Sequence, residues 1–252
     1  MFILAIKSLI QRVLRKLGWE LQRFENAHVE QQVLKKILSW TGAEIVLDVG
    51  ANVGQYGDLV FETGFEGTVI SFEAIPTVHQ KLSAHARRKS RRWIVAPCAA
   101  LGTQRGNVAI NVSANLVSSS VLPMLGAHLD AAPESRYVRQ QTVAVERLDE
   151  FAPALLPPTG QLLIKVDTQG YEMQVLKGAI GLLPRTVAIQ LELSLLPLYE
   201  GAPTFTELIA FVQASGFELF SIIPGFRDPR SGRLLQADGF FVRAEARPRA
   251  DG

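Results

Sequence analysis

Residues 46–56, VLDVGANVGQY, decide the fold of this chain. Residues 45–49 form a mostly apolar run of the length expected for a central parallel strand, and a helix is predicted to follow the turn. Gly50 and Gly54 allow that turn to be tight where the backbone must approach a ligand closely. A buried strand, a glycine turn and a helix in this order are typical of a nucleotide-cofactor site in a doubly wound α/β sheet.

Two residues of this stretch indicate which ligand the turn binds. The dinucleotide pattern G-x-G-x-x-G lets a pyrophosphate rest on the helix N-terminus, but Asn52 stands here at the place of the middle glycine. Asp48 precedes the turn, and its carboxylate would repel a pyrophosphate but attract the amino group and sulfonium of S-adenosylmethionine. The sign of the charge favours S-adenosylmethionine as cofactor, and an NAD-dependent oxidoreductase is the alternative.

Composition limits the class of protein. With 252 residues, of which 48% are hydrophobic, the chain can bury a full core in one catalytic domain. The formal net charge of +2 is too small to indicate a nucleic-acid partner. Cys98 is the only cysteine, which excludes a disulfide within one chain and predicts a reducing, cytoplasmic location. The four histidines show no metal-ligand spacing, so no metal ligands are assigned.

The N-terminus carries a separate pattern. In residues 2–17 apolar side chains recur with helical period and basic side chains lie opposite them, which predicts an amphipathic helix. Lys7 and Arg12 interrupt the apolar run, so the segment is not a transmembrane span. Its apolar stripe either packs on the domain or a partner subunit, or lies on a membrane surface. We therefore predict an amphipathic helical appendage over residues 1–42 and a catalytic domain over residues 43–252.

The order of predicted elements is that of an open α/β sheet finished by an antiparallel strand. Strands are predicted at residues 45–49, 68–72, 93–97, 108–112, 142–145, 161–166, 186–191, 217–222 and 240–243. Helices are predicted at residues 29–40, 55–63, 76–88, 148–156, 171–183 and 205–215. The irregular stretch around residues 118–125 (SSSVLPML) is long enough to suggest a functional loop.

Four acidic residues follow or end predicted strands: Asp48, Glu73, Asp167 and Glu192. Because ligands bind at the carboxyl edge of such a sheet, we expect these side chains to form one site. Glu73 comes about one βαβ step after the glycine turn, where an acid can accept hydrogen bonds from both ribose hydroxyls. Asp167 and Glu192 could also hold a divalent cation, but no third carboxylate of clear geometry supports one.

The stretch KVDTQGYE, residues 165–172, is the candidate reaction centre. A strand stops at Asp167, and Glu172 lies in the first turn of the next predicted helix, so both could face one cavity. Methyl transfer to an alcohol needs alignment of the reacting atoms and a group that accepts the proton. A carboxylate or Lys165 could accept it, although Lys165 and Asp167 could equally form a structural ion pair.

Longer motifs resemble a known family. The motifs VLDVGANVGQY, SFEAIP (residues 71–76), RLDEF (147–151) and LIKVDTQGYEMQVLKGA (163–179) are similar to those of FkbM-type S-adenosylmethionine-dependent methyltransferases. The resemblance covers most of residues 46–242 and implies a Rossmann-like class I fold with a mostly parallel seven-stranded sheet and an antiparallel edge strand. Where the family commonly reads FEPxP, this chain has Ala74, which changes the stiffness of the loop.

The resemblance also implies roles for individual residues. Those expected to bind the cofactor are Asp48, Gly50, Asn52, Gly54, Glu73, Ala99 and Ala100. Those expected at the reaction centre are Asp167 and Glu172, to which the stretch at residues 165–172 adds Lys165. The resemblance does not settle which of them is the base, and we choose Asp167. Those expected to bind the acceptor are Ser118, Ser119, Ser120, Gln169, Glu192, Tyr199 and Asp238.

The motifs at residues 118–125, 190–201 and 235–243 are similar to the branch of the family that O-methylates fucosyl or rhamnosyl hydroxyls of cell-envelope glycolipids. This implies a lipid-linked sugar substrate, and it gives the segment of residues 1–24 a reason to contact the inner face of a membrane. O-methylation of a polyketide or macrolide hydroxyl is the alternative within the family. A cofactor-binding scaffold without catalysis, and a homo-oligomer, also remain open.

Overall fold

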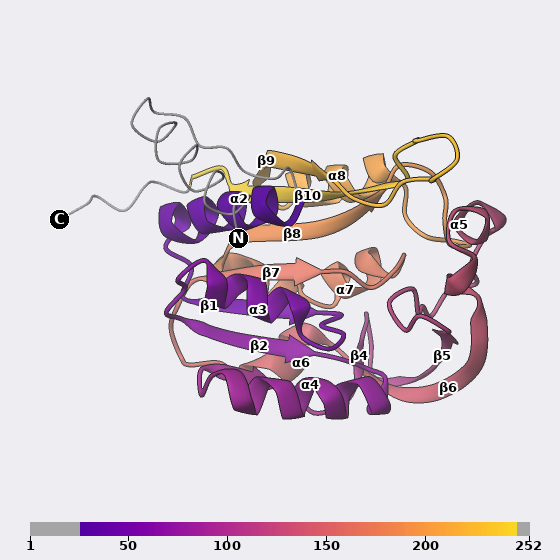
Figure 1. The fold of residues 1–252 in the computed structure, drawn as a ribbon. Coiled ribbons are helices and arrows are strands. Elements are labelled where there is room, and N and C mark those ends of the chain that lie inside the picture. Colours follow the sequence, from indigo (N-terminus) through magenta and orange to yellow (C-terminus); the bar gives the residue numbers. More distant parts are fainter. Residues whose placement is uncertain (1–25, 246–252) are drawn as a thin grey trace, which may run out of the picture.

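Seven strands form the central sheet of the computed structural model, which describes residues 26–245 (Figure 1). Their order is β3-β2-β1-β7-β8-β10-β9; β10 runs antiparallel to both neighbours, and the other neighbouring pairs are parallel. The strands are β1 (Ile45–Val49), β2 (Thr68–Phe72), β3 (Trp93–Val95), β7 (Leu162–Val166), β8 (Thr186–Ser194), β9 (Phe217–Pro224) and β10 (Gln236–Arg243). The predicted Rossmann-like sheet is confirmed, with the antiparallel strand one place in from the edge.

A second sheet of three strands lies beyond the carboxyl ends of the parallel strands, together with the short helix α5 (Figure 1). Its strands and helix are β4 (Ala100–Leu101), β5 (Gly106–Ser113), β6 (Tyr137–Glu146) and α5 (Gly126–Ala131). The strands predicted at residues 108–112 and 142–145 are the centres of β5 and β6, which pair antiparallel. The irregular stretch between them is thereby held at the ligand-binding edge of the main sheet.

Helices cover both faces of the main sheet (Figure 1). One face carries α2 (Asn26–Thr41), α3 (Gln55–Glu62) and α4 (Pro76–Lys89), and the other carries α6 (Leu148–Phe151), α7 (Glu172–Lys177) and α8 (Phe205–Ala214). Each face has its own apolar core because successive side chains of a strand point to opposite faces. The apolar face of α2 belongs to the first of these cores, where Leu34 and Ile37 are buried.

Two predicted helices are shorter than expected. The helix predicted at residues 171–183 ends as α7 at Lys177, and a 3-10 helix follows over Ile180–Arg185. The helix ends at Gly178, whose backbone is in close contact with that of Gly102: a Cβ on Gly178 would lie 2.0 Å from the carbonyl oxygen of Gly102. The helix predicted at residues 148–156 ends as α6 at Phe151 and continues as the proline-containing 3-10 turn Ala152–Ala154.

Strand β8 is longer than predicted. We expected it to end at Leu191, with Glu192 just beyond it, but it continues to Ser194. Pairing with the antiparallel β10 extends the ladder, and Glu192 is the register partner of Asp238. Glu192 is therefore a residue within the strand, and pairing with β10 fixes its position.

The amphipathic helix predicted at residues 2–17 lies outside the described residues. Between residues 26 and 245, no helix has both the length and the apolar character needed to span a bilayer.

Candidate functional site

A cavity opens at the carboxyl ends of β1, β2 and β7, at the edge where the glycine turn and the acidic residues were predicted to meet. It contains about 750 Å³ of empty space, part of it open to solvent. The loop at residues 116–121 closes one side of it. The predicted site residues that line the cavity are Gly50, Asn52, Glu73, Ala99, Ala100, Asp167, Gln169, Ser119 and Ser120.

The glycine turn forms one wall of this cavity. Gly50 has φ 76°, and a Cβ at this position would lie 1.9 Å from the carbonyl oxygen of Asp167. Asn52 adopts φ 48°, a left-handed conformation that asparagine tolerates better than most residues. Gly54, at φ 107°, packs against the ring of Trp93. The turn thus brings bare backbone to the cavity, as a bound nucleoside requires.

Glu73 is fixed by the backbone around it. Its Oε2 accepts a hydrogen bond from the backbone N–H of Asn52 at 2.9 Å, and its Oε1 accepts one from Ile75 at 2.8 Å. Burial raises the pKa of this carboxyl from 4.5 to about 7, although the backbone donors counteract the shift. A bound ribose would supply two hydroxyl donors and compensate for the lost hydration, so Glu73 fits the predicted ribose contact.

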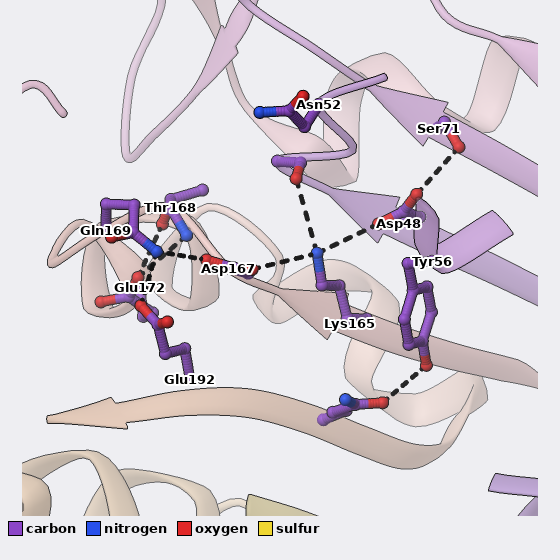
Figure 2. A network of polar contacts seen from close by, with 12 residues as sticks. Asp48, Asn52, Tyr56, Ser71, Lys165, Asp167, Thr168, Gln169, Glu172 and Glu192 are labelled. Atoms are coloured by element: carbon purple, nitrogen blue, oxygen red, sulfur yellow. Dashed lines mark hydrogen bonds and ion pairs between the residues drawn. The ribbon is translucent and has the colours of Figure 1, made fainter. Parts of the chain in front are cut away.

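Asp48 lies beside the cavity and does not line it. Its side chain is shut off from solvent and accepts a hydrogen bond from Ser71 at 3.0 Å. Its Oδ1 is 3.3 Å from Nζ of Lys165, its register partner on β7 (Figure 2). The structure thus places Asp48 and Lys165 in a buried ion pair that supports the glycine turn from within the sheet.

Lys165 also contacts Asp167, which lines the cavity. Its Nζ is 3.5 Å from Oδ2 of Asp167 and 3.4 Å from the carbonyl oxygen of Gly50 (Figure 2). Burial opposes the positive charge of Lys165, but Asp167 and Asp48 hold its pKa above the ordinary lysine value. Lys165 is therefore a cation that positions carboxylates, and its high pKa makes it a poor proton acceptor.

Gln169 connects Asp167 to the residues predicted for the acceptor. Its Nε2 donates to Asp167 Oδ1 and to Glu192 Oε2, both at 2.8 Å (Figure 2). Its Oε1 accepts a hydrogen bond from the hydroxyl of Tyr199 at 2.7 Å. The residue adopts φ 55°, and its carbonyl accepts a hydrogen bond from Ser120 at 2.7 Å. A non-glycine residue held in this conformation by four partners indicates a site whose geometry is fixed in advance.

Glu172 does not line the cavity. Its Oε1 accepts backbone hydrogen bonds from Thr168 at 2.9 Å and from Gly170 at 3.0 Å, and only 3% of the residue is exposed. Burial raises its pKa to about 7. In this arrangement Glu172 stabilises the loop that carries Asp167 and Gln169.

The remaining predicted acceptor residues surround this loop. Ser118 is buried and forms a hydrogen bond to Ser135 at 2.9 Å, whereas its two neighbours Ser119 and Ser120 line the cavity. Asp238 lies beside Glu192 on β10, and burial raises its pKa to about 7. The structure therefore brings Gln169, Glu192, Tyr199 and Asp238 together on the side of Asp167 away from Glu73.

Several residues of the site were not predicted. Thr168 and Tyr171 line the cavity, and their place in the stretch KVDTQGYE could have pointed to them. Leu116 and Val117 line it from the irregular loop, which carries no recognisable pattern. Glu30 of α2 accepts a hydrogen bond from Gln190 at 2.8 Å on the same face of the sheet as Lys165, a contact between residues 160 positions apart.

Between residues 26 and 245, no three His, Cys, Asp or Glu side chains are grouped so that they could hold a metal ion.

The donor set of the cavity fits S-adenosylmethionine. Gly50 and Asn52 give close backbone approach, Glu73 gives a ribose acceptor, and residues 99–101 form an apolar wall for an adenine ring. Asp167 supplies negative charge that complements a sulfonium. When bound, this donor supplies an electrophilic methyl group.

Comparison with known proteins supports S-adenosylmethionine as the cofactor. Residues 48–219, more than half of the chain, match the family described as "Methyltransferase FkbM domain". Among curated proteins, none matches the sequence with significance.

Solved structures show distant similarity. The "putative O-methyltransferase" from Klebsiella pneumoniae has 11% sequence identity, with 94% of this chain and 89% of that chain covered and a TM-score of 0.49. Streptococcus pneumoniae Sp1610 in complex with S-adenosyl-L-methionine has 13% sequence identity, with 85% of this chain and 72% of that chain covered and a TM-score of 0.46. The precorrin-6y C5,15-methyltransferase from Geobacter metallireducens GS-15 has 12% sequence identity, with 84% of this chain and 86% of that chain covered and a TM-score of 0.43. The family assignment rests on the domain match.

Proposed function

The chain belongs to the FkbM methyltransferase family, and from this premise we propose that it transfers the methyl group of S-adenosylmethionine to a sugar hydroxyl of a lipid-linked glycan. Dependence on S-adenosylmethionine follows from the family, and the cavity has the donor set that this compound requires. The glycine turn alone left S-adenosylmethionine and NAD as alternatives, and the family assignment favours S-adenosylmethionine.

The observation that carries the sugar proposal is the acidic group beside the cavity. Glu192 and Asp238 are register partners next to Asp167, and each carboxylate can accept hydrogen bonds from hydroxyl groups. Gln169, itself held by the hydroxyl of Tyr199, fixes Glu192 beside Asp167. Several fixed acceptors favour a ligand with several hydroxyl donors, as a sugar has, over a ligand with one isolated hydroxyl.

Oxygen as the methylated atom is supported by the same group. An alcohol must lose its proton as it attacks the methyl carbon, and carboxylates next to the donor cavity can receive that proton. The lipid-linked nature of the acceptor is an inference from the resemblance of residues 118–125, 190–201 and 235–243 to glycolipid-modifying enzymes.

The test is methyl transfer from labelled donor to a rhamnosyl or fucosyl glycolipid, to the same lipid without its sugar, and to a macrolide alcohol. We expect a mass gain of one methyl group on the intact glycolipid alone. Transfer to the macrolide, with none to the glycolipid, would instead support the alternative within the family.

A further inference from the structure

The two carboxylates bound by Gln169 differ in how many of their oxygens are occupied. Asp167 has Oδ1 bonded to Nε2 of Gln169 at 2.8 Å, and Oδ2 lies 3.5 Å from Nζ of Lys165. Glu192 has Oε2 bonded to the same amide nitrogen at 2.8 Å. Its Oε1 accepts no hydrogen bond from any residue that the structure describes. One carboxylate is therefore fully engaged, and the other has a free oxygen.

Lys165 places a fixed cation beside Asp167. Its ammonium group is held in place by Asp48 and by the carbonyl oxygen of Gly50. Both oxygens of Asp167 therefore already face donors, Oδ1 the amide of Gln169 and Oδ2 the ammonium group of Lys165. Because Asp167 lines the donor cavity, its carboxylate can complement the sulfonium of the donor.

Glu192 has the opposite surroundings. The titratable groups that face it are Asp167 from β7, Glu172 from α7, Asp238 from β10 and Tyr199 from the segment after β8. Burial raises its pKa well above 4.5, the three acids raise it further, and only the hydrogen bond from Gln169 opposes them. With no ammonium partner and one oxygen free of hydrogen bonds from described residues, Glu192 can receive a proton at Oε1.

We propose that Glu192 takes the proton from the acceptor hydroxyl, while the carboxylate of Asp167 supports binding of the sulfonium. The inference rests on the proposed O-methyl transfer. The hydroxyl oxygen forms a bond to the methyl carbon as the carbon–sulfur bond breaks, with its electron pair left on sulfur. The proton passes to Oε1 of Glu192 and then to solvent. Gln169 acts as a positioning residue, because its single amide nitrogen holds Glu192 beside Asp167.

Calorimetry separates the two roles without turnover. S-adenosylmethionine carries the sulfonium charge and S-adenosylhomocysteine lacks it, so the ratio of their affinities reports on Asp167. Asp167→Asn should weaken S-adenosylmethionine about tenfold more than S-adenosylhomocysteine. Glu192→Gln, which keeps the size of the side chain, should change this ratio by less than about twofold. Equal weakening of both ligands by Asp167→Asn would overturn the assignment of Asp167.

Turnover on the glycolipid tests Glu192. Glu192→Gln should lower kcat by about 10²- to 10³-fold with an unchanged donor affinity, because general-base catalysis contributes this much. Gln169→Ala should lower kcat as well, and Gln169→Asn should restore little of it because the shorter amide cannot reach both carboxylates. A Glu192→Gln enzyme with kcat within about threefold of wild type would overturn the proposal.

Failure of the proposed function gives a different result. If wild type binds donor but methylates no glycolipid, the acceptor class is wrong, and carbon NMR of the carboxyl groups still tests Glu192. The resonance that disappears in Glu192→Gln should titrate well above the ordinary glutamate range in the wild type. Titration within that range would overturn the assignment of Glu192 as proton acceptor.

Discussion

Asp48 and Lys165 face each other on neighbouring strands, with Oδ1 and Nζ 3.3 Å apart and both side chains nearly closed to solvent. Trp93 donates to Ser71, and Ser71 donates to Asp48, so the pair ends a polar row that crosses β3, β2, β1 and β7. The buried charge pair thus supports the glycine turn of the cofactor cavity. The sequence pattern placed Asp48 at the ligand, whereas the structure gives it this supporting position.

Lys165→Met should destabilise the fold by about 3 to 5 kcal/mol, because it leaves the buried charge of Asp48 without its partner. The free energy of unfolding in urea measures this loss. Lys177→Met is the matched control, since Lys177 is exposed on α7, and it should change stability by less than about 0.5 kcal/mol. Adding Asp48→Asn to Lys165→Met should recover part of the loss. Equal stabilities of the Lys165→Met and Lys177→Met proteins would show that the pair contributes nothing.

Gly50→Ala should abolish donor binding. Its Cβ would lie 1.9 Å from the carbonyl oxygen of Asp167, so the glycine turn and the loop of Asp167 would be forced apart. Gly64→Ala is the control for backbone conformation alone, since Gly64 has φ 87° and open space around its Cβ position. That variant should lose about 1 to 2 kcal/mol of stability and bind donor normally. Normal donor affinity in Gly50→Ala would contradict the cavity assignment.

Donor affinity should depend on the protonation of Glu73, whose pKa is raised by burial to about 7. The ribose hydroxyls need the carboxylate as acceptor, so affinity should fall as pH decreases below about 7, by at most tenfold per unit. Calorimetric titration with S-adenosylhomocysteine measures this slope. Glu73→Gln should bind more weakly and lose the slope. A wild-type affinity that is flat over this range would rule out Glu73 as the titrating contact.

Glu73 should also make the folding stability of the unliganded protein depend on pH. Because the folded pKa of Glu73 is raised, the folded state binds more protons than the unfolded state between pH 4.5 and about 7. Wild type should therefore lose stability relative to Glu73→Gln as pH rises through this window, and the difference should become constant above it. Glu172 and Asp238, also with a pKa of about 7, are present in both proteins and cancel in the comparison. Urea unfolding at several pH values gives the difference, and an opposite trend would contradict the raised pKa.

The sequence predicted the main sheet because its strands are short apolar runs between glycine or proline signals, and each such run was found. It could not predict where α7 stops, because that depends on Gly178 meeting Gly102, a contact between residues far apart in the chain. The site shows the same division. Glu73 and Asp167 could be placed from their order along the chain, but the role of Gln169 depends on its three side-chain partners, which only the folded structure brings together.

Membrane contact is a prediction about residues 1–24, whose sequence carries an apolar stripe opposite Lys7, Arg12, Arg15 and Lys16. A protein that lacks these residues should bind anionic liposomes more weakly than the full chain, because it loses both the apolar stripe and the cations. Its affinity for S-adenosylhomocysteine should be unchanged, since every residue that lines the donor cavity follows residue 48.

Liposome sedimentation measures the difference, with neutral vesicles as the comparison for the electrostatic part. A full-length variant in which the four cations are replaced by glutamine keeps the stripe and should bind anionic vesicles only as well as neutral ones. If the shortened protein sediments with liposomes as fully as the intact chain does, the segment instead serves packing within the domain or against a partner subunit. Another surface of the protein would then have to contact the membrane to reach a lipid-linked acceptor.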